Sequence, residues 1–125
     1  MHNFPKREHI VSTRLIEQLF SSGSTSMAAY PLRAVFRIVE RGQTKVPVQV
    51  LISVPKKRFK HAVDRNRVKR QVREAYRHRK QPLADAIPAD QSLLLGFVWV
   101  GDRLIPSSIV TSRIEKLLTR ITEKL

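Results

Sequence analysis

The sequence predicts an α+β fold: a single-domain αβ sandwich in which three helices pack on a small mixed sheet. Two observations support this class. Stretches with the apolar spacing of helices and stretches with the alternation of strands follow one another in the order helix, two strands, helix, strand, helix. The chain also has 125 residues, which is enough for one hydrophobic core and not for two. We therefore predict a single domain over residues 1–125.

The N-terminal part predicts an extended basic arm over residues 1–11, with Pro5 near its start, followed by a short helix. Ser12 or Thr13 can cap this helix. Gly23 ends it. Its apolar residues recur at helical spacing and are Val11, Leu15, Ile16, Leu19 and Phe20.

Two strands follow the first helix. Residues 33–40 alternate between an apolar side and a mixed side, as a strand at the surface of a core does. Residues 46–54 form the second strand, with Pro47 near its start, where proline is tolerated. Only the turn 41–45 separates the two, so we predict that they form a hairpin.

A basic helix is predicted next. Pro55 ends the second strand, residues 56–60 form a basic loop, and the helix spans residues 61–79. Its apolar side consists of Ala62, Val68, Val72, Ala75 and Tyr76.

The remainder predicts a loop, a strand and a helix. Pro82 and Pro88 mark the loop. The nearly continuous apolar run 93–100 is typical of a central strand covered on both faces. Pro106 begins a terminal helix whose apolar stripe reaches Leu125.

The charge of the chain predicts a polyanionic partner. The formal net charge is +14, whereas a net charge of about 2–8 keeps a small domain soluble. Residues 56–80 carry twelve Lys or Arg and two acids, so this one segment accounts for +10 of the net charge. Like charges three and four residues apart on a helix repel. Such a helix is best tolerated when phosphates neutralise it, which favours nucleic acid over a merely solvated face.

Several function classes are excluded by what the sequence lacks. No cysteine is present, so disulfides, a thiol nucleophile and thiolate metal sites are ruled out. The histidines lack metal-site spacing and no glycine-rich phosphate loop occurs, so we predict no catalytic residue and no metal site in the protein. The alternative cation ligands Asp85, Asp90 and Asp102 are loop acids of a kind that is usually only solvated. The N-terminus has no secretory signal and no apolar run could span a membrane, so we expect a cytoplasmic protein with no membrane partner.

The basic helix predicts the form of the nucleic-acid contact. Its cations recur at every fourth residue along a stripe of about 18 Å, which matches several successive phosphates. The members of this stripe are Arg65, Lys69, Arg73 and Arg77. Asn66 lies within the cluster, and its amide can recognise a base edge or a 2′-hydroxyl. Phe20 and Phe36 are core residues or, where the sheet is open, platforms for unpaired bases.

The segment from Ser53 to Arg77, SVPKKRFKHAVDRNRVKRQVREAYR, resembles the signature of the bacterial ribonuclease P protein subunit. That signature has a Lys-Lys pair and then Ala-Val-x-Arg-Asn-Arg-x-Lys-Arg-x-x-Arg-Glu on a helix. The helix ending Leu19-Phe20-x-x-Gly23 is less closely similar to the first helix of the family. The order of elements agrees over essentially the whole chain.

This resemblance implies a fold and a function. The fold is like that of domain 2 of ribosomal protein S5, with the basic helix as a crossover between parallel strands. The function is that of the protein subunit of the ribonuclease P ribonucleoprotein, an endoribonuclease and hydrolase of tRNA processing. A catalytic RNA with Mg²⁺ removes the 5′ leader of precursor tRNA, so Mg²⁺ is expected on the RNA and substrate. The implied partners are the ribonuclease P RNA and precursor tRNA, with no DNA.

The resemblance also assigns residues to two RNA surfaces. The residues implied to bind the catalytic RNA are Lys56, Lys57, Arg65, Asn66, Arg67 and Arg70. The residues implied to line a cleft for the 5′ leader are Phe20, Phe36, Ser53, Lys69 and Arg73. Ile16 stands where many members of the family have Phe, which weakens one stacking position of that cleft.

Two other functions fit parts of the sequence. A stand-alone basic RNA-binding protein of ribosomal or ribosome-assembly type shares every feature except the family signature. A DNA-binding protein would place the Arg-rich helix in a major groove, but such proteins more often have a helix-turn-helix or a dimer seam, and the sequence has neither.

Overall fold

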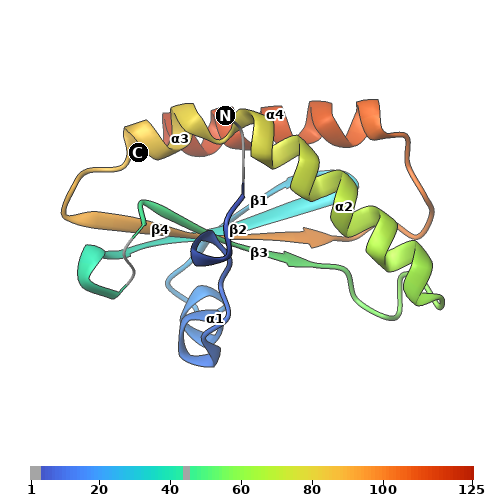
Figure 1. Cartoon of the computed structure of the whole chain (residues 1–125), viewed down its shortest axis with the longest axis horizontal. Coiled ribbons are helices and arrows are strands. Elements are labelled where there is room, and N and C mark those ends of the chain that lie inside the picture. The colour runs from blue at the N-terminus through green and yellow to red at the C-terminus, as the bar shows by residue number, and fades with distance from the viewer. Residues whose placement is uncertain (1–3, 44–45) are drawn as a thin grey trace.

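A mixed sheet with the strand order β1-β2-β4-β3 organises the computed structural model of the chain (Figure 1). Its strands are β1 (Thr25–Ala29), β2 (Leu32–Glu40), β3 (Val48–Ser53) and β4 (Gln91–Trp99). The pairs β1–β2 and β2–β4 are antiparallel, and β3–β4 is parallel. The structure describes residues 4–43 and 46–125, so the first three residues of the predicted arm, and Thr44 and Lys45 of the predicted turn, lie outside it.

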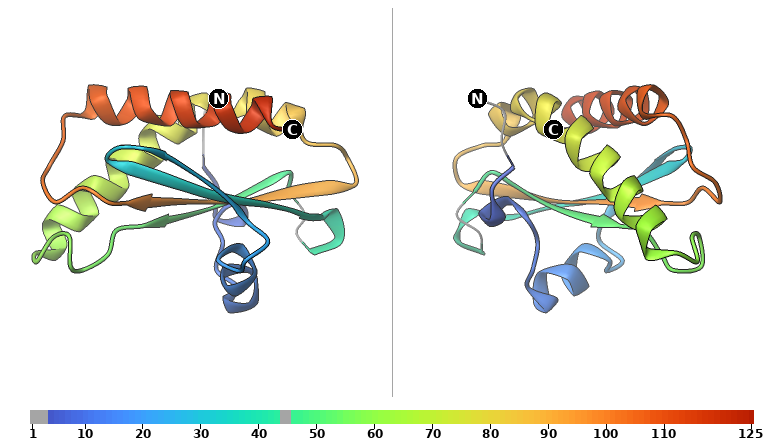
Figure 2. Two further views of the ribbon diagram at one scale, coloured as in Figure 1. Left: turned by 180° about the vertical axis from the view of Figure 1, so that it is seen from behind. Right: turned by 45° about the vertical axis from the view of Figure 1, so that its right-hand side comes forward.

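Helices cover both faces of this sheet. They are α1 (Thr13–Leu19), α2 (Ala62–Arg79), α3 (Gln81–Ala86) and α4 (Ser107–Glu123), with short 3-10 turns η1 (Lys6–Glu8) and η2 (Arg41–Gln43). Within the described residues, the helices α2, α3 and α4 lie on one face, and α1 lies on the other (Figure 2). The α+β class and the three predicted helices are confirmed. The fourth helix, α3, replaces the predicted loop because Pro82 stands in its first turn, where proline is compatible with a helix.

The predicted hairpin of the second and third strands is wrong. β4 lies between β2 and β3, pairs antiparallel with β2 over its whole length, and pairs parallel with β3. The hairpin of the structure is instead β1–β2, joined through Tyr30 and Pro31. β1 escaped prediction because its five residues are small or polar and show little alternation. The parallel β3–β4 connection runs through α2, which confirms the predicted crossover.

The core consists of two clusters separated by the sheet. The larger cluster lies under α2 and α4 and contains Trp99, Tyr76 and Phe97. The smaller cluster lies under α1, where Leu15 and Leu19 pack against strand residues and Ile10. β4 is buried on both faces, as its apolar run predicts. Val11 was predicted on the apolar side of the first helix, but it precedes the N-cap Ser12 and is 84% exposed.

The N-terminal arm packs along the outer edge of β3. The amide of Ile10 donates to the carbonyl of Val50 at 2.9 Å. The ring of Phe4 stacks on His9 with centroids 3.9 Å apart and lies 5.2 Å from the ring of Tyr76 on α2. The arm therefore joins the edge strand to the basic helix. None of the helices in the described residues is long and apolar enough to cross a membrane.

Candidate nucleic-acid interface

Helix α2 divides its residues between the core and the solvent. Val68, Val72, Ala75 and Tyr76 are buried against the sheet and α4. Because a residue advances about 100° around a helix, the cations between these positions point sideways and outwards. Burial of this single stripe holds the charged surface rigidly on the sheet.

The loop before α2 is fixed at two points. Phe59 is buried and lies 6.2 Å, between ring centroids, from Trp99. The guanidinium of Arg65 donates to the carbonyls of Phe59 and Lys60, at 2.7 and 3.2 Å. These contacts hold Lys56 and Lys57, both exposed, beside the first turn of α2. Arg65 thus positions the loop, a role that the sequence did not reveal.

The other predicted α2 residues fall on two flanks and the outer surface. Arg67 and Arg70 are exposed and line a groove that α2 shares with the start of α4. By helical position, Asn66 and Arg73 point outwards and towards the β3 side, together with half-buried Lys69. The six residues of α2 that the sequence assigned to RNA contact therefore belong to one continuous convex surface; they are Arg65, Asn66, Arg67, Lys69, Arg70 and Arg73.

An acid limits this surface at its C-terminal end. Glu74 is exposed and accepts a hydrogen bond from Arg77 at 2.8 Å, with the ring of His78 at 3.5 Å. The hydrogen bond from Arg77, followed by the charges of Arg77 and His78, holds the pKa of Glu74 below its ordinary value. Glu74 therefore stays ionised near neutral pH and offsets part of the positive charge of the last turns.

A second surface lies on the α1 face of the sheet. Phe20 follows α1 and is 48% exposed. Its ring lies 3.7 Å from the position that a Cβ would take at Gly96, and a methyl group of Leu19 lies 3.0 Å from it. The absence of a side chain at position 96 lets the end of α1 approach the sheet and lets the aromatic ring lie over the strand.

Alternation along the strands places further residues on this face. Ser53 is opposite Val98 in the β3–β4 ladder, and both are half-buried. Arg33 is also opposite Val98, in the β2–β4 ladder, and is exposed. Arg37, on the same face, donates to the carbonyl of Gln18 at 3.5 Å and to the hydroxyl of Ser21, which ties the end of α1 to β2. The sequence reasoning missed Arg33 and Arg37, although both stand on the mixed side of the predicted strand.

Phe36 does not belong to this surface. It is 5% exposed and packs in the larger core cluster, on the face opposite Phe20. Its neighbours Val35 and Arg37 are the residues that face α1, because side chains alternate along a strand. The expectation that Phe36 lies on one surface with Phe20 is therefore not met, because the strand register turns its ring to the other face.

The two surfaces meet at one end of the sheet. The N-terminal end of α2 slopes past the ends of β3 and β4 towards the level of the α1 face (Figures 1 and 2). Lys56 and Lys57 follow the end of β3 at Ser53, with only Val54 and Pro55 between. The cationic surface of α2 and the open part of the α1 face are thus adjacent, although Lys69 and Arg73 stand on α2 and not beside Phe20.

The side chains of this region are hydrogen-bond donors and cations, which suit an anion better than a metal ion. Among residues 4–43 and 46–125, no three His, Asp or Glu side chains gather as a metal site would require. The interface presents guanidinium, ammonium and amide groups, whereas Mg²⁺ requires oxygen ligands such as carboxylates. Arg binds phosphate through a planar fork of donors. The surface can therefore bind a sugar-phosphate backbone, with Phe20 available for stacking.

Comparison with known proteins identifies similar chains. The family model of ribonuclease P matches residues 4–98. The ribonuclease P protein component of Porphyromonas gingivalis is 38% identical over 117 residues, which cover 93% of this chain and 84% of that protein. The ribonuclease P protein component of Chlorobium phaeobacteroides is 40% identical over 84 residues, or 66% of this chain and 58% of that protein.

Solved structures share the fold. A Staphylococcus aureus RNase P protein mutant with defective mRNA degradation activity superposes with a TM-score of 0.72 at 17% identity, over 93% of this chain and 89% of that one. The RNase P protein from Thermotoga maritima gives a TM-score of 0.62 at 22% identity, over 90% of this chain and 96% of that one.

Proposed function

The chain belongs to the ribonuclease P protein family, and from this premise we propose that it holds two RNA segments on its two adjoining surfaces. As a member, it is a subunit of ribonuclease P, an endoribonuclease of tRNA processing. The convex surface of α2 and the loop before it bind the ribonuclease P RNA. The α1 face of the sheet binds the 5′ leader of precursor tRNA.

The observation that carries this proposal is the meeting of the two surfaces at the ends of β3 and β4. An RNA bound along α2 reaches Lys56 and Lys57, where it lies beside a leader that passes Ser53 and stacks on Phe20. The protein thereby keeps the substrate next to the RNA subunit. Holding two reactants in a fixed relation lowers the entropic cost of their encounter.

We propose further that the RNA carries the chemistry and the Mg²⁺. The protein offers its own side chains as phosphate ligands, and these cations neutralise the repulsion between substrate and RNA subunit. These fixed cations replace part of the dissolved Mg²⁺ that would otherwise screen the repulsion between the two RNAs. The protein should therefore lower the Mg²⁺ concentration that cleavage requires.

A reconstitution with three arms tests this function. Precursor tRNA is incubated with the protein alone, the RNA subunit alone, and both together, over a series of Mg²⁺ concentrations. We expect no cleavage by the protein alone and cleavage at lower Mg²⁺ with both components than with RNA alone. Cleavage by RNA-free protein would contradict the assignment of the chemistry, and an unchanged Mg²⁺ requirement would contradict the role of the protein.

A further inference from the structure

Helix α4 carries its cations along one flank. Its cations recur at intervals of three, four and four residues, which keeps them within about 80° of the helix circumference. These cations are Arg113, Lys116, Arg120 and Lys124, the last of which caps the helix. Of the two acids, Glu115 lies well away from this arc, whereas Glu123 lies about 20° around the helix from Lys116.

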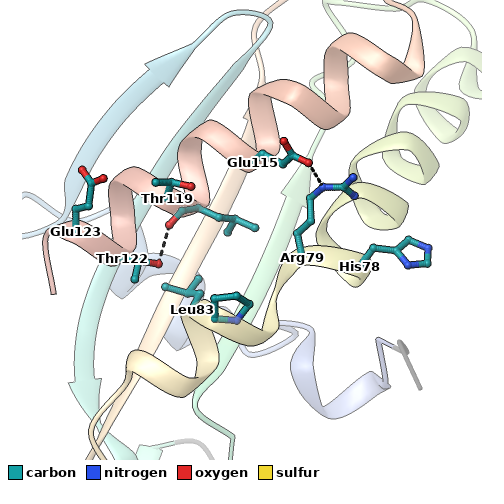
Figure 3. Close-up of a pocket in the computed structure, with 9 residues that line it drawn as sticks. His78, Arg79, Leu83, Glu115, Thr119, Thr122 and Glu123 are labelled. Carbon is teal, nitrogen blue, oxygen red and sulfur yellow. Dashed lines mark hydrogen bonds and ion pairs between the residues drawn. The ribbon is translucent and has the colours of Figure 1, made fainter.

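The acids face the groove between α4 and the α2–α3 segment. Glu115 pairs with Arg79 of α2 at 2.5 Å, and Glu123 lines the same groove (Figure 3). Thr119 and Thr122 lie between them (Figure 3). Glu115 is therefore directed towards the basic helix, whereas Glu123 is the one acid of α4 beside the cationic flank, near its C-terminal end.

The cationic flank lies along the outer edge of β1. Arg113 donates through Nε to the carbonyl of Tyr30 at 2.9 Å, and Arg120 donates through Nη1 to the carbonyl of Ala28 at 3.3 Å. These two bonds fix the guanidinium groups along the edge strand. Lys116 and Lys124 are exposed between and beyond them. Tyr30 is 52% exposed at one end of the row.

This flank is remote from the surfaces described above. β1 and β3 are the opposite edges of the sheet, and α2 packs towards β3 while α4 packs towards β1 and β2. The helix also lies beyond residue 98, where the match to the family model ends. The cationic flank of α4 therefore requires its own explanation.

We propose that the β1-side flank of α4, with Tyr30, is a further RNA-binding surface that takes a single-stranded segment. The row from position 113 to position 124 is about 16 Å long, which is enough for a few successive phosphates. Exposed Tyr30 beside Arg113 supplies a ring on which a base stacks, and cations with an adjacent aromatic ring are the usual elements of single-strand binding. An acidic protein would use the cations but not the ring, so RNA is the better fit.

Salt dependence of RNA binding tests this proposal. The full-length variant K116Q/K124Q removes two exposed cations and keeps the Arg113 and Arg120 bonds to β1. The control variant R14Q/R103Q removes two exposed cations elsewhere and has the same net charge. The probe is a fluorescent oligouridylate, titrated at several salt concentrations. Each phosphate contact to single-stranded RNA contributes about 0.7 to the log–log slope, so K116Q/K124Q should flatten it by about 1.4 units.

A second set of variants separates the contribution of this flank to RNA binding from that of α2. K116Q/K124Q and the control R14Q/R103Q are each introduced into a chain that also carries R67A/R70A. We expect the flattening of about 1.4 units to persist there, because the two surfaces are independent. Ultraviolet cross-linking of a 4-thiouridine oligonucleotide should also label the peptide that contains Tyr30. A slope change in K116Q/K124Q no larger than in the control would overturn the proposal, including the case in which the flank binds an acidic protein.

Discussion

Phe20 is the residue that best separates leader binding from ordinary packing. Its ring is half exposed over Gly96, whereas Phe36 is buried in the core under α4. The two phenylalanines thus form a natural pair of test and control, one on each face of the sheet.

The substitution Phe20→Leu keeps an apolar side chain but removes the flat ring. We expect weaker binding of precursor tRNA, by about 1–3 kcal/mol, because aromatic–base stacking is lost. Binding of mature tRNA, which has no leader, should not change. Titration of both tRNAs measures the difference. The control Phe36→Leu should cost about 1 kcal/mol of folding stability and weaken neither binding selectively. Equal losses for both tRNAs in Phe20→Leu would show that the ring only packs.

Gly96→Ala tests the close approach of α1 to the sheet. The new methyl group would lie 3.0 Å from a methyl group of Leu19 and 3.7 Å from the ring of Phe20, so the buried Leu19 side chain must give way by a few tenths of an ångström. We expect a loss of about 1–3 kcal/mol in the free energy of unfolding, measured by urea denaturation, and a smaller preference for precursor over mature tRNA. Gly42→Ala is the control, because no described residue other than its chain neighbours has an atom within 4 Å of its Cβ position. A fully stable Gly96→Ala protein with unchanged preference would contradict this account of the site.

At the scale of the element, α2 holds its positive charges in fixed positions. Its buried residues anchor the helix to the sheet, and Arg65 ties the preceding loop to the helix. Variants of Arg65 therefore disturb the loop as well as the RNA contact, whereas Arg67 and Arg70 report on contact with RNA more cleanly.

The variant R67A/R70A should flatten the salt dependence of binding to the ribonuclease P RNA. Each lost phosphate contact lowers the log–log slope by about 0.7–0.9, so we expect a change of about 1.5 units. Circular dichroism should show an unchanged fold, since both side chains are exposed. A slope equal to that of the wild type would mean that this flank of α2 does not touch phosphates.

The sequence predicted long periodic elements well and short ones poorly. The basic helix was expected over 61–79 and spans Ala62–Arg79, because its apolar stripe and the prolines around it are local signals. β1 and α3 have five and six residues and carry no such signal. The face of Phe36 depends on one position of register, which tertiary packing against α4 decides and local pattern does not.

At the scale of the whole molecule, the N-terminal arm joins parts that are distant in the sequence. Lys80 at the end of α2 pairs with Glu8 of the arm at 2.6 Å, and the two side chains are only 14% and 16% exposed. Strand order is decided at the same scale. The insertion of β4 between β2 and β3 could not be predicted, because it depends on contacts between residues 51 to 67 positions apart.

Lys80→Met should destabilise the protein by leaving the carboxylate of Glu8 poorly solvated and without this partner. We expect a loss of about 1–3 kcal/mol in the free energy of unfolding, measured by urea denaturation. The control Glu74→Gln breaks an exposed ion pair and should cost less than about 1 kcal/mol. The variant E8Q/K80M should recover part of the loss, and an absence of recovery would show that the pair itself is not the cause.

The central place of β4 has a consequence for the order of folding. β4 is the last strand to be synthesised, yet both β2 and β3 pair with it. Until residues 91–99 have left the ribosome, only the β1–β2 hairpin and isolated helices can form, and β3 has no neighbour in the sheet. Sheet completion must therefore await nearly the whole chain, and the many non-local pairings make this step slow compared with helix formation. During that interval the twelve cations of residues 56–80 stand on a nascent chain without a core, surrounded by the RNA of the ribosome that makes it.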